Sequence, residues 1–304
     1  MTKPTTDRLI FFGTDAFSVP TLIRLLAEGW NIVAVITKPD SPAGRGRETT
    51  MPAVKKLALA SSIRVLQPDK LSDANDEITA LKPRVGIVVA YGKIIPASTI
   101  KLFPKGLINI HASLLPRHRG AAPIEAALLA GDTSTGISLM RIEPGLDTGP
   151  VFNTTKLQLT GTETRLQLYE QLAELGAELL ATKLAGILAG DIVPIPQSHA
   201  HATHVSRLSK TDGDIDWSKP AATLEREVRA YLGWPGSHAR VAGTEAVITA
   251  AHTTNQDGHP GTAYRTPSGE LAVYAGSGSL VIDRLKPAGK REMTGPEFLS
   301  GHPL

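Results

Sequence analysis

The chain has 304 residues, enough for one large or two modest domains, and 41% of them are hydrophobic, as is typical of a globular protein. Its formal net charge of +3 at pH 7 is too small to indicate nucleic-acid binding by itself. Cysteine is absent, which excludes disulfide bonds and cysteine metal sites and fits a reducing cytoplasm. The sequence has neither a signal-peptide pattern nor about eighteen consecutive apolar residues, so we expect neither secretion nor a membrane span.

The N-terminal part predicts a βαβ unit. Arg8–Phe12 is an apolar run that ends at Gly13, Phe17–Glu28 carries apolar residues at helical spacing, and Ile32–Ile36 is a second β-branched run. The turn after the first run reads Gly-Thr-Asp-Ala-Phe-Ser and lacks the G-x-G-x-x-G pattern, so a nicotinamide or flavin dinucleotide is not indicated. We therefore expect a Rossmann-like α/β fold without that cofactor.

The alternation of strands and helices continues to about residue 189. We expect further strands at Ile63–Leu66, Val85–Ala90, Gly136–Arg141 and Val151–Leu159. We expect helices at Pro52–Ala60, Ala74–Leu81, Pro123–Ala130 and Glu163–Leu188, the last with Thr162 as its N-cap and Gly190 beyond its end.

A polar loop follows the apolar approach to residue 108. The segment 109–124 reads NIHASLLPRHRGAAPI, and Ile108 and Ile110 alternate with Asn109 and His111. On a strand this alternation puts the amide and the imidazole on one face, two residues apart. The alternative is that Asn109 only ends the strand and that His111 is a buried structural histidine.

A second polar segment, Arg141–Pro150, contains Asp147 in the sequence Gly-Leu-Asp-Thr-Gly. Alone, such an aspartate more often bonds its own turn. Together with Asn109 and His111 it completes a set with an oxyanion donor, a titratable imidazole and a carboxylate. Ser113, His111 and Asp147 could also be imagined as a hydrolase triad, but Ser113 does not lie in a G-x-S-x-G motif.

The sequence SLLPRHRGAAPI after NIHA, followed by GLDTGP, resembles the folate-dependent formyltransferases, over nearly the whole chain from Phe12-Gly13-Thr14 onward. The resemblance implies a Rossmann-like formyltransferase domain with a mostly parallel sheet, followed by a small OB-like β-barrel domain. It implies 10-formyltetrahydrofolate as formyl donor, no metal, and Asn109, His111 and Asp147 as the catalytic residues. Which of His111 and Asp147 moves which proton stays open.

The resemblance also indicates where the folate binds. It assigns cofactor binding to the loop that follows the catalytic strand, Ser113, Leu114, Leu115 and Pro116, and to the strand-end loop with Tyr91 and Gly92. Arg119 is expected to position the loop or the folate tail. An ordinary turn is the alternative for Tyr91 and Gly92.

A basic insertion at residues 38–51, KPDSPAGRGRETTM, lacks apolar periodicity. Between Lys38 and Lys56 the chain has five basic residues against two acidic ones, an excess equal to that of the whole chain. A solvated surface loop is the usual interpretation of such a run. The resemblance instead implies contact with initiator tRNA through Arg45, supported by Lys38 and Arg47. The implied reaction is formyl transfer to the α-amine of methionyl-initiator tRNA, for translation initiation in the cytoplasm.

The C-terminal part has a different character. We expect a catalytic domain at residues 1–189, a Pro- and His-rich linker at 190–207 and an OB-like tRNA-binding domain at 208–304. The last has a helix at Ala221–Tyr231 and strands at His238–Val241, Ala246–Ala251, Leu271–Tyr274 and Ser279–Leu285. From residue 205 onward it carries eleven basic and eleven acidic residues, so tRNA affinity would need a local patch, for which we expect Lys286, Lys290 and Arg291.

Four alternatives remain at this stage. His199, His201 and His204 suggest a metal site, although such residues in an extended segment more often line a surface. A formyltransferase acting on a sugar-nucleotide amine would share the Asn-His-Asp set but would lack the basic insertion, whereas a glycinamide ribonucleotide formyltransferase would have no C-terminal domain. A non-enzymatic RNA-binding protein would tolerate loss of the Asp147 carboxylate. We expect a monomer.

Overall fold

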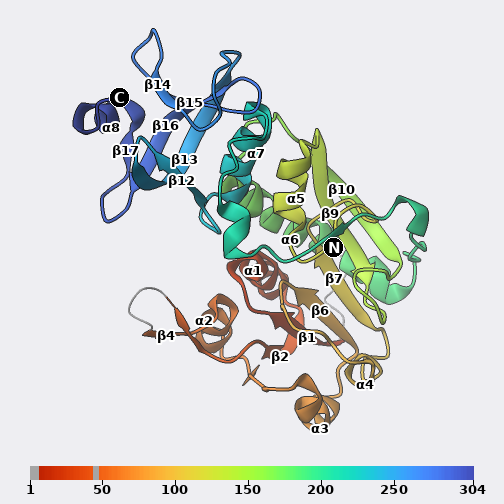
Figure 1. Cartoon of the computed structure of the whole chain (residues 1–304). Helices are drawn as coiled ribbons and strands as arrows, with labels where there is room; N and C mark the ends of the chain where they lie inside the picture. The colour runs from red at the N-terminus through yellow and green to blue at the C-terminus, as the bar shows by residue number, and fades with distance from the viewer. Residues whose placement is uncertain (1–6, 44–47) are drawn as a thin grey trace. The chain divides into compact units, whose positions relative to one another are not determined.

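The computed structural model describes residues 7–43 and 48–304 (Figure 1). Arg45 and Arg47, two of the predicted tRNA contacts, lie outside the described residues. The chain forms two compact units. Unit 1 comprises residues 1–120, 135–158 and 169–204, and unit 2 comprises residues 121–134, 159–168 and 205–304.

Unit 1 is built on a seven-stranded sheet with the order β10-β9-β7-β6-β1-β2-β5. Its strands are β1 (Arg8–Gly13), β2 (Asn31–Ile36), β5 (Val65–Leu66), β6 (Val85–Val89), β7 (Leu107–His111), β9 (Ser134–Arg141) and β10 (Val151–Gln158). All pairs from β5 to β7 are parallel, and β9 joins β7 in antiparallel orientation. The prediction of a mostly parallel sheet is confirmed.

All but one of the helices associated with this sheet follow the expected segments. They are α1 (Val19–Ala27), α2 (Ala53–Ala60), α3 (Asn75–Ala80), α4 (Ala97–Ile100) and α6 (Arg165–Ala189), with a 3-10 turn η1 at Ala16–Ser18 and another, η2, at Leu71–Ala74. The N-cap predicted at Thr162 was two residues early. Thr164 and Gln167 instead bond each other's backbone N–H groups, which starts α6 at Arg165. The sequence interpretation missed α4.

The two faces of β7 have different environments. Gly176 of α6 lies against Ile110 and Ile137, and a Cβ at this glycine would come within 2.8 Å of Ile110 Cγ2. Helix α6 therefore covers the face that holds Ile108 and Ile110. Because side chains alternate along a strand, Asn109 and His111 lie on the opposite face.

The carboxyl ends of the central strands meet at one edge of the sheet. The Thr14 hydroxyl, just after β1, donates to the carbonyl of Tyr91 after β6 at 3.0 Å. The backbone N–H of Lys38, after β2, approaches Thr14 Oγ1 at 3.4 Å. In open α/β sheets ligands bind at this edge, which also receives the end of β7 at His111.

The basic insertion contains two short antiparallel strands, β3 (Ser41–Ala43) and β4 (Glu48–Thr50), where no regular structure was expected. Its start is anchored to the body of unit 1. Both Asp40 carboxylate oxygens accept from Lys55 Nζ, at 2.9 and 2.7 Å, and one also accepts from Gln67. The Lys55 and Gln67 hydrogen bonds lower the pKa of Asp40. Lys55 is thus paired within the protein.

Unit 2 has an antiparallel sheet with the order β12-β13-β16-β15-β14, and β17 pairs with β16. The strands are β12 (Ser237–Val241), β13 (Thr244–Thr254), β14 (Ala263–Arg265), β15 (Leu271–Tyr274), β16 (Ser279–Pro287) and β17 (Met293–Thr294). The helices are α5 (Pro123–Ala130), α7 (Ala221–Tyr231) and α8 (Gly295–Gly301), and 3-10 turn η4 covers Lys210–Gly213. Leu224, Val228 and Phe298 lie in a core with the inner residues of the strands. The expected strands are present and form an antiparallel sheet, and the OB-like barrel stays a prediction.

Candidate active site

The end of β7 presents Asn109 and His111 on one face. Asn109 is partly buried, and its amide makes no hydrogen bond to any residue that the structure describes. His111 is only 6% exposed. An amide that is neither buried nor internally bonded is free to donate to a ligand, whereas the imidazole is held in place.

Backbone contacts fix the tautomer of His111. Its Nε2 lies 2.9 Å from the carbonyl oxygen of His118, and a carbonyl can only accept. Nε2 therefore carries a proton, and Nδ1 is the nitrogen that gains or loses one. Nδ1 faces Asp147 Oδ2 at 3.7 Å, which is too long for a hydrogen bond but close enough for an ion pair when the imidazole is protonated.

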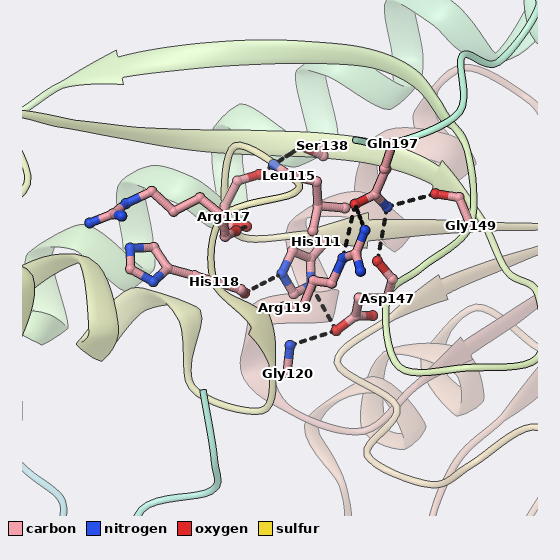
Figure 2. Close-up of polar contacts among 11 residues, drawn as sticks. His111, Leu115, Arg117, His118, Arg119, Gly120, Ser138, Asp147, Gly149 and Gln197 are labelled. Carbon is pink, nitrogen blue, oxygen red and sulfur yellow. Dashed lines mark hydrogen bonds and ion pairs between the residues drawn. The ribbon is translucent and has the colours of Figure 1, made fainter. Parts of the chain in front are cut away.

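The Asp147 carboxylate is held from the other side by Gly120, whose backbone N–H donates to Oδ2 at 2.8 Å (Figure 2). Asp147 has φ of 52°, a left-handed conformation that is uncommon for a residue with a side chain. Such conformations persist where the surroundings hold them, and they occur often at functional sites. The structure thus brings together His111 and Asp147, which are 36 positions apart.

The loop after β7 is rigid. Ser113 is fully buried, and its hydroxyl donates to the carbonyl of Arg117 at 2.6 Å. Ser138 on β9 closes the loop, because its hydroxyl donates to the Ser113 carbonyl at 2.7 Å and accepts from Leu115 N–H at 3.0 Å. Since the Ser113 hydroxyl bonds the backbone and not His111, the arrangement is not a hydrolase triad.

A polar network joins this loop to the segment 195–205. Arg119 is 2% exposed, and its Nε and one terminal nitrogen donate to Gln197 Oε1 at 3.0 and 2.8 Å. Gln197 Nε2 donates in turn to the carbonyls of Asp147 and Gly149, at 2.9 and 2.7 Å, as Figure 2 shows. Strand β8 (Arg119–Gly120) pairs with β11 (His204–Val205). The segment expected to be only a linker therefore packs on the site.

The histidines of this segment do not form a cluster. Two of them, His199 and His201, lie in the 3-10 turn η3 (His199–His201). His199 Nδ1 accepts a hydrogen bond from Arg119 at 3.2 Å, so the proton of the neutral His199 imidazole is on Nε2. In the described part of the chain, no group of three or more His, Asp or Glu side chains lies close enough together to hold a metal. His199 is thus a partner of Arg119.

The sequence interpretation missed Gln197, Ser138 and the N–H of Gly120. No local pattern marks any of them: Gln197 lies in a Pro- and His-rich stretch and Ser138 lies inside a strand. Their roles follow only from contacts between distant segments.

The residues assigned to the folate differ in exposure. Leu114, Leu115 and Pro116 are partly exposed, while the Ser113 side chain is not accessible. Tyr91 is 2% exposed, its hydroxyl has no hydrogen-bond partner among the residues that the structure describes, and burial raises its pKa to about 12. Contact with a folate through Tyr91 and Gly92 would therefore be made by their backbone.

The site has features that fit a folate. Gly92 has φ of 72°, and a Cβ there would meet the Lys38 side chain. Ile94, two residues further, is 93% exposed. The Asn109 amide, which makes no hydrogen bond to the described residues, is a group that can bind the polar edge of a flat ring system. The folate contacts themselves stay a prediction.

The expected basic patch of unit 2 is partly neutralised. Lys286, Lys290 and Arg291 are all exposed, and Lys286 lies on β16. Arg291 forms an ion pair with Glu297 at 3.2 Å and also donates to the carbonyl of Glu292. Lys286 also interacts electrostatically with Glu292, and phosphate contact by any of the three residues remains a prediction.

Comparison with known proteins shows the family of the chain. Residues 7–184 match the family model described as formyl transferase, and residues 207–303 match the formyl transferase C-terminal domain. The chain belongs to the formyltransferase family. This formyltransferase is 41% identical to the methionyl-tRNA formyltransferase of Myxococcus xanthus, over 100% of this chain and 97% of that protein. It is 42% identical to the methionyl-tRNA formyltransferase of Chloroflexus aurantiacus, over 97% of this chain and 96% of that protein.

Solved structures resemble this formyltransferase in fold. An N-formyltransferase from Helicobacter canadensis, in complex with folinic acid and dTDP-3-aminofucose, aligns with a TM-score of 0.71 at 18% identity, over 93% of this chain and 100% of that one. HypX from Aquifex aeolicus, in complex with tetrahydrofolic acid, aligns with a TM-score of 0.65 at 18% identity, over 97% of this chain and 47% of that one. In the described part of the formyltransferase no helix is long and apolar enough to cross a membrane.

Proposed function

We propose that this formyltransferase transfers the formyl group of 10-formyltetrahydrofolate to the α-amine of methionyl-initiator tRNA, for translation initiation in the cytoplasm. The observation that carries the chemistry is the pairing of His111 Nδ1 with Asp147 Oδ2, beside the free amide of Asn109. Acyl transfer to an amine needs a hydrogen-bond donor for the developing oxyanion and groups that move protons, and these three side chains supply both.

Each residue has a defined part in this mechanism. When bound, the folate supplies the formyl group and the nitrogen that accepts a proton on leaving. Asn109 donates to the formyl oxygen as negative charge develops there. His111 and Asp147 form the proton relay: as the bond from amine nitrogen to formyl carbon forms and the bond to the folate nitrogen breaks, one proton passes from the amine to that nitrogen. His111 works through Nδ1, because Nε2 is bound to the His118 carbonyl.

The choice of acceptor rests on similarity over the full length. The methionyl-tRNA formyltransferases are 39–42% identical to this chain over at least 97% of it, whereas the N-formyltransferase crystallised with an aminosugar nucleotide is 18% identical. The basic insertion adds support, since guanidinium groups suit phosphate contact and stacking on unpaired bases. We assign Lys38, Arg45 and Arg47 to the acceptor end of the tRNA.

The remaining assignments belong to the same proposal. Two segments line the folate site. Ser113 to Pro116 contribute through the shape of their loop, and Tyr91 and Gly92 contribute through their backbone groups. Residues 1–189 act as the catalytic domain, 190–207 as the connection, and 208–304 as an OB-like tRNA-binding domain with Lys286, Lys290 and Arg291. The protein works as a monomer and without a metal.

A two-acceptor assay tests the proposal. The enzyme and 10-formyltetrahydrofolate are given methionyl-initiator tRNA in one reaction and a 4-amino-sugar nucleotide in the other, with Asp147→Asn as the control variant. We expect formylation of the tRNA alone and a loss of about 10²–10⁴-fold in the variant. Formylation of the sugar alone would overturn the tRNA assignment, and activity on neither acceptor would overturn the proposed reaction.

A further inference from the structure

Gln197 uses its whole hydrogen-bonding capacity on the active-site loops. Its amide has two N–H donors and a carbonyl oxygen with two acceptor positions. The donors reach the carbonyls of Asp147 and Gly149, and the oxygen accepts from two nitrogens of Arg119. Because carbonyls only accept and a guanidinium only donates, this orientation of the amide is fixed by its partners.

The partners of Gln197 are constrained in their turn. Arg119 is 2% exposed, its third nitrogen donates to His199, and its backbone N–H donates to the Thr203 carbonyl at 2.9 Å. A buried guanidinium with this many partners is a fixed point in the site. Gln197 thus connects a rigid residue of one loop with the backbone of the other.

The segment held by Gln197 is the one that needs support. Asp147 has φ of 52°, and such a left-handed conformation costs of order 1–3 kcal/mol for a residue other than glycine. The two hydrogen bonds from Gln197 lie at the carbonyl of Asp147 and two residues beyond it, at Gly149. They hold the turn that aims the carboxylate at His111 and Gly120.

We infer that Gln197 is a positioning residue for Asp147: it contacts no reacting atom, and it acts by holding the Asp147 backbone so that Oδ2 faces His111 Nδ1. This inference rests on the proposed role of Asp147. It places a determinant of the reaction in a segment that sequence patterns assign to a linker. It also gives Arg119 a structural task, as the base on which Gln197 is held.

The decisive variant is Gln197→Glu. A glutamate still accepts from Arg119, so the buried guanidinium keeps a partner and the fold is preserved. In this variant a carboxylate oxygen replaces the Nε2 amino group that donates to the carbonyls of Asp147 and Gly149. Both hydrogen bonds are lost, and the carboxylate oxygen repels the two carbonyl oxygens. A displacement of about 1 Å at a catalytic group can cost about 10²-fold, so we expect kcat to fall by about 10–100-fold while KM for both substrates changes by less than about threefold.

A double variant separates positioning from a general structural role. If Gln197 acts only through Asp147, Gln197→Glu in the Asp147→Asn background lowers kcat by less than about twofold further. The ¹H–¹⁵N signals of the His111 ring give a readout that needs no substrate, and we expect the same displacement in Gln197→Glu as in Asp147→Asn. His201→Ala is the matched control, because His201 is exposed in the same turn as His199 and its side chain makes no hydrogen bond to the described residues.

The outcomes distinguish the two proposals. Full additivity in the double variant, or unchanged His111 signals in Gln197→Glu, would overturn the positioning role even if Asp147→Asn is inactive. An active Asp147→Asn enzyme would instead overturn the catalytic role of Asp147. A loss in His201→Ala equal to that in Gln197→Glu would also refute the inference, because it would trace the effect to the segment as a whole.

Discussion

Replacing Ser138 with alanine is expected to loosen the loop that follows β7. Ser138 is fully buried, and its hydroxyl joins the Ser113 carbonyl, at 2.7 Å, to the Leu115 N–H, at 3.0 Å. The change leaves a carbonyl and an amide without partners, each at a cost of about 1–3 kcal/mol. Since the loop can move to recover part of this, we expect about 2–4 kcal/mol of local destabilisation.

Hydrogen exchange at the Leu115 amide measures this effect directly. A loss of 2–4 kcal/mol corresponds to an acceleration of about 30- to 700-fold if exchange proceeds by local opening. We also expect KM for the formyl donor to rise, because this loop is assigned to the folate site. Ser134→Ala is the control, since Ser134 begins the same strand and makes no side-chain hydrogen bond to residues that the structure describes. An unchanged exchange rate in Ser138→Ala would refute the role given to this hydroxyl.

Two further predictions concern single side chains. Asn109→Ala should lower kcat by about 10²–10³-fold, because it removes the proposed oxyanion donor, and single-turnover assays with both substrates saturating measure this. A variant that keeps more than about a tenth of the rate would exclude Asn109 as the oxyanion donor. Burial raises the pKa of Tyr91 and of Tyr231 to about 12, so two of the five tyrosines should ionise late in an alkaline absorbance titration. Because these two tyrosines resist ionisation in the folded protein but ionise near pH 10 in the unfolded chain, the free energy of unfolding falls as the pH rises from about 10 toward 12. A single transition of all five tyrosines near pH 10 would contradict the raised pKa of Tyr91 and Tyr231.

Periodicity predicted most of unit 1. The apolar runs of β1 and β6 are buried on both faces, as is the second half of β2, so they are continuous in the sequence and easy to recognise. The face of β7 that carries Asn109 and His111 was predictable from another local pattern, because alternation alone puts these residues on the side opposite Ile108 and Ile110. Such features depend on neighbours along one strand.

Other features depend on partners far away in the chain. Gln197 contacts Asp147 from 50 positions away, and nothing in its own segment indicates this. Ser113 matched a family motif, yet its side chain is buried and bonds the backbone, which only the folded loop determines. By contrast, α8 had a local signal that was overlooked: Thr294 and Glu297 form a capping box, with Pro296 in the first turn.

The discontinuity of unit 2 matters for anyone who wishes to express the parts separately. Helix α5 lies within residues 1–189 but packs against α7, and Arg226 of α7 donates to the carbonyl of Leu129 at 3.1 Å. A fragment that stops at residue 189 would lose α7, and the apolar side chains of α5, such as Leu128, would lose part of their cover. We expect such a fragment to aggregate unless those side chains are replaced by polar ones, so we expect truncation at residue 189 not to give an independently folded N-terminal part.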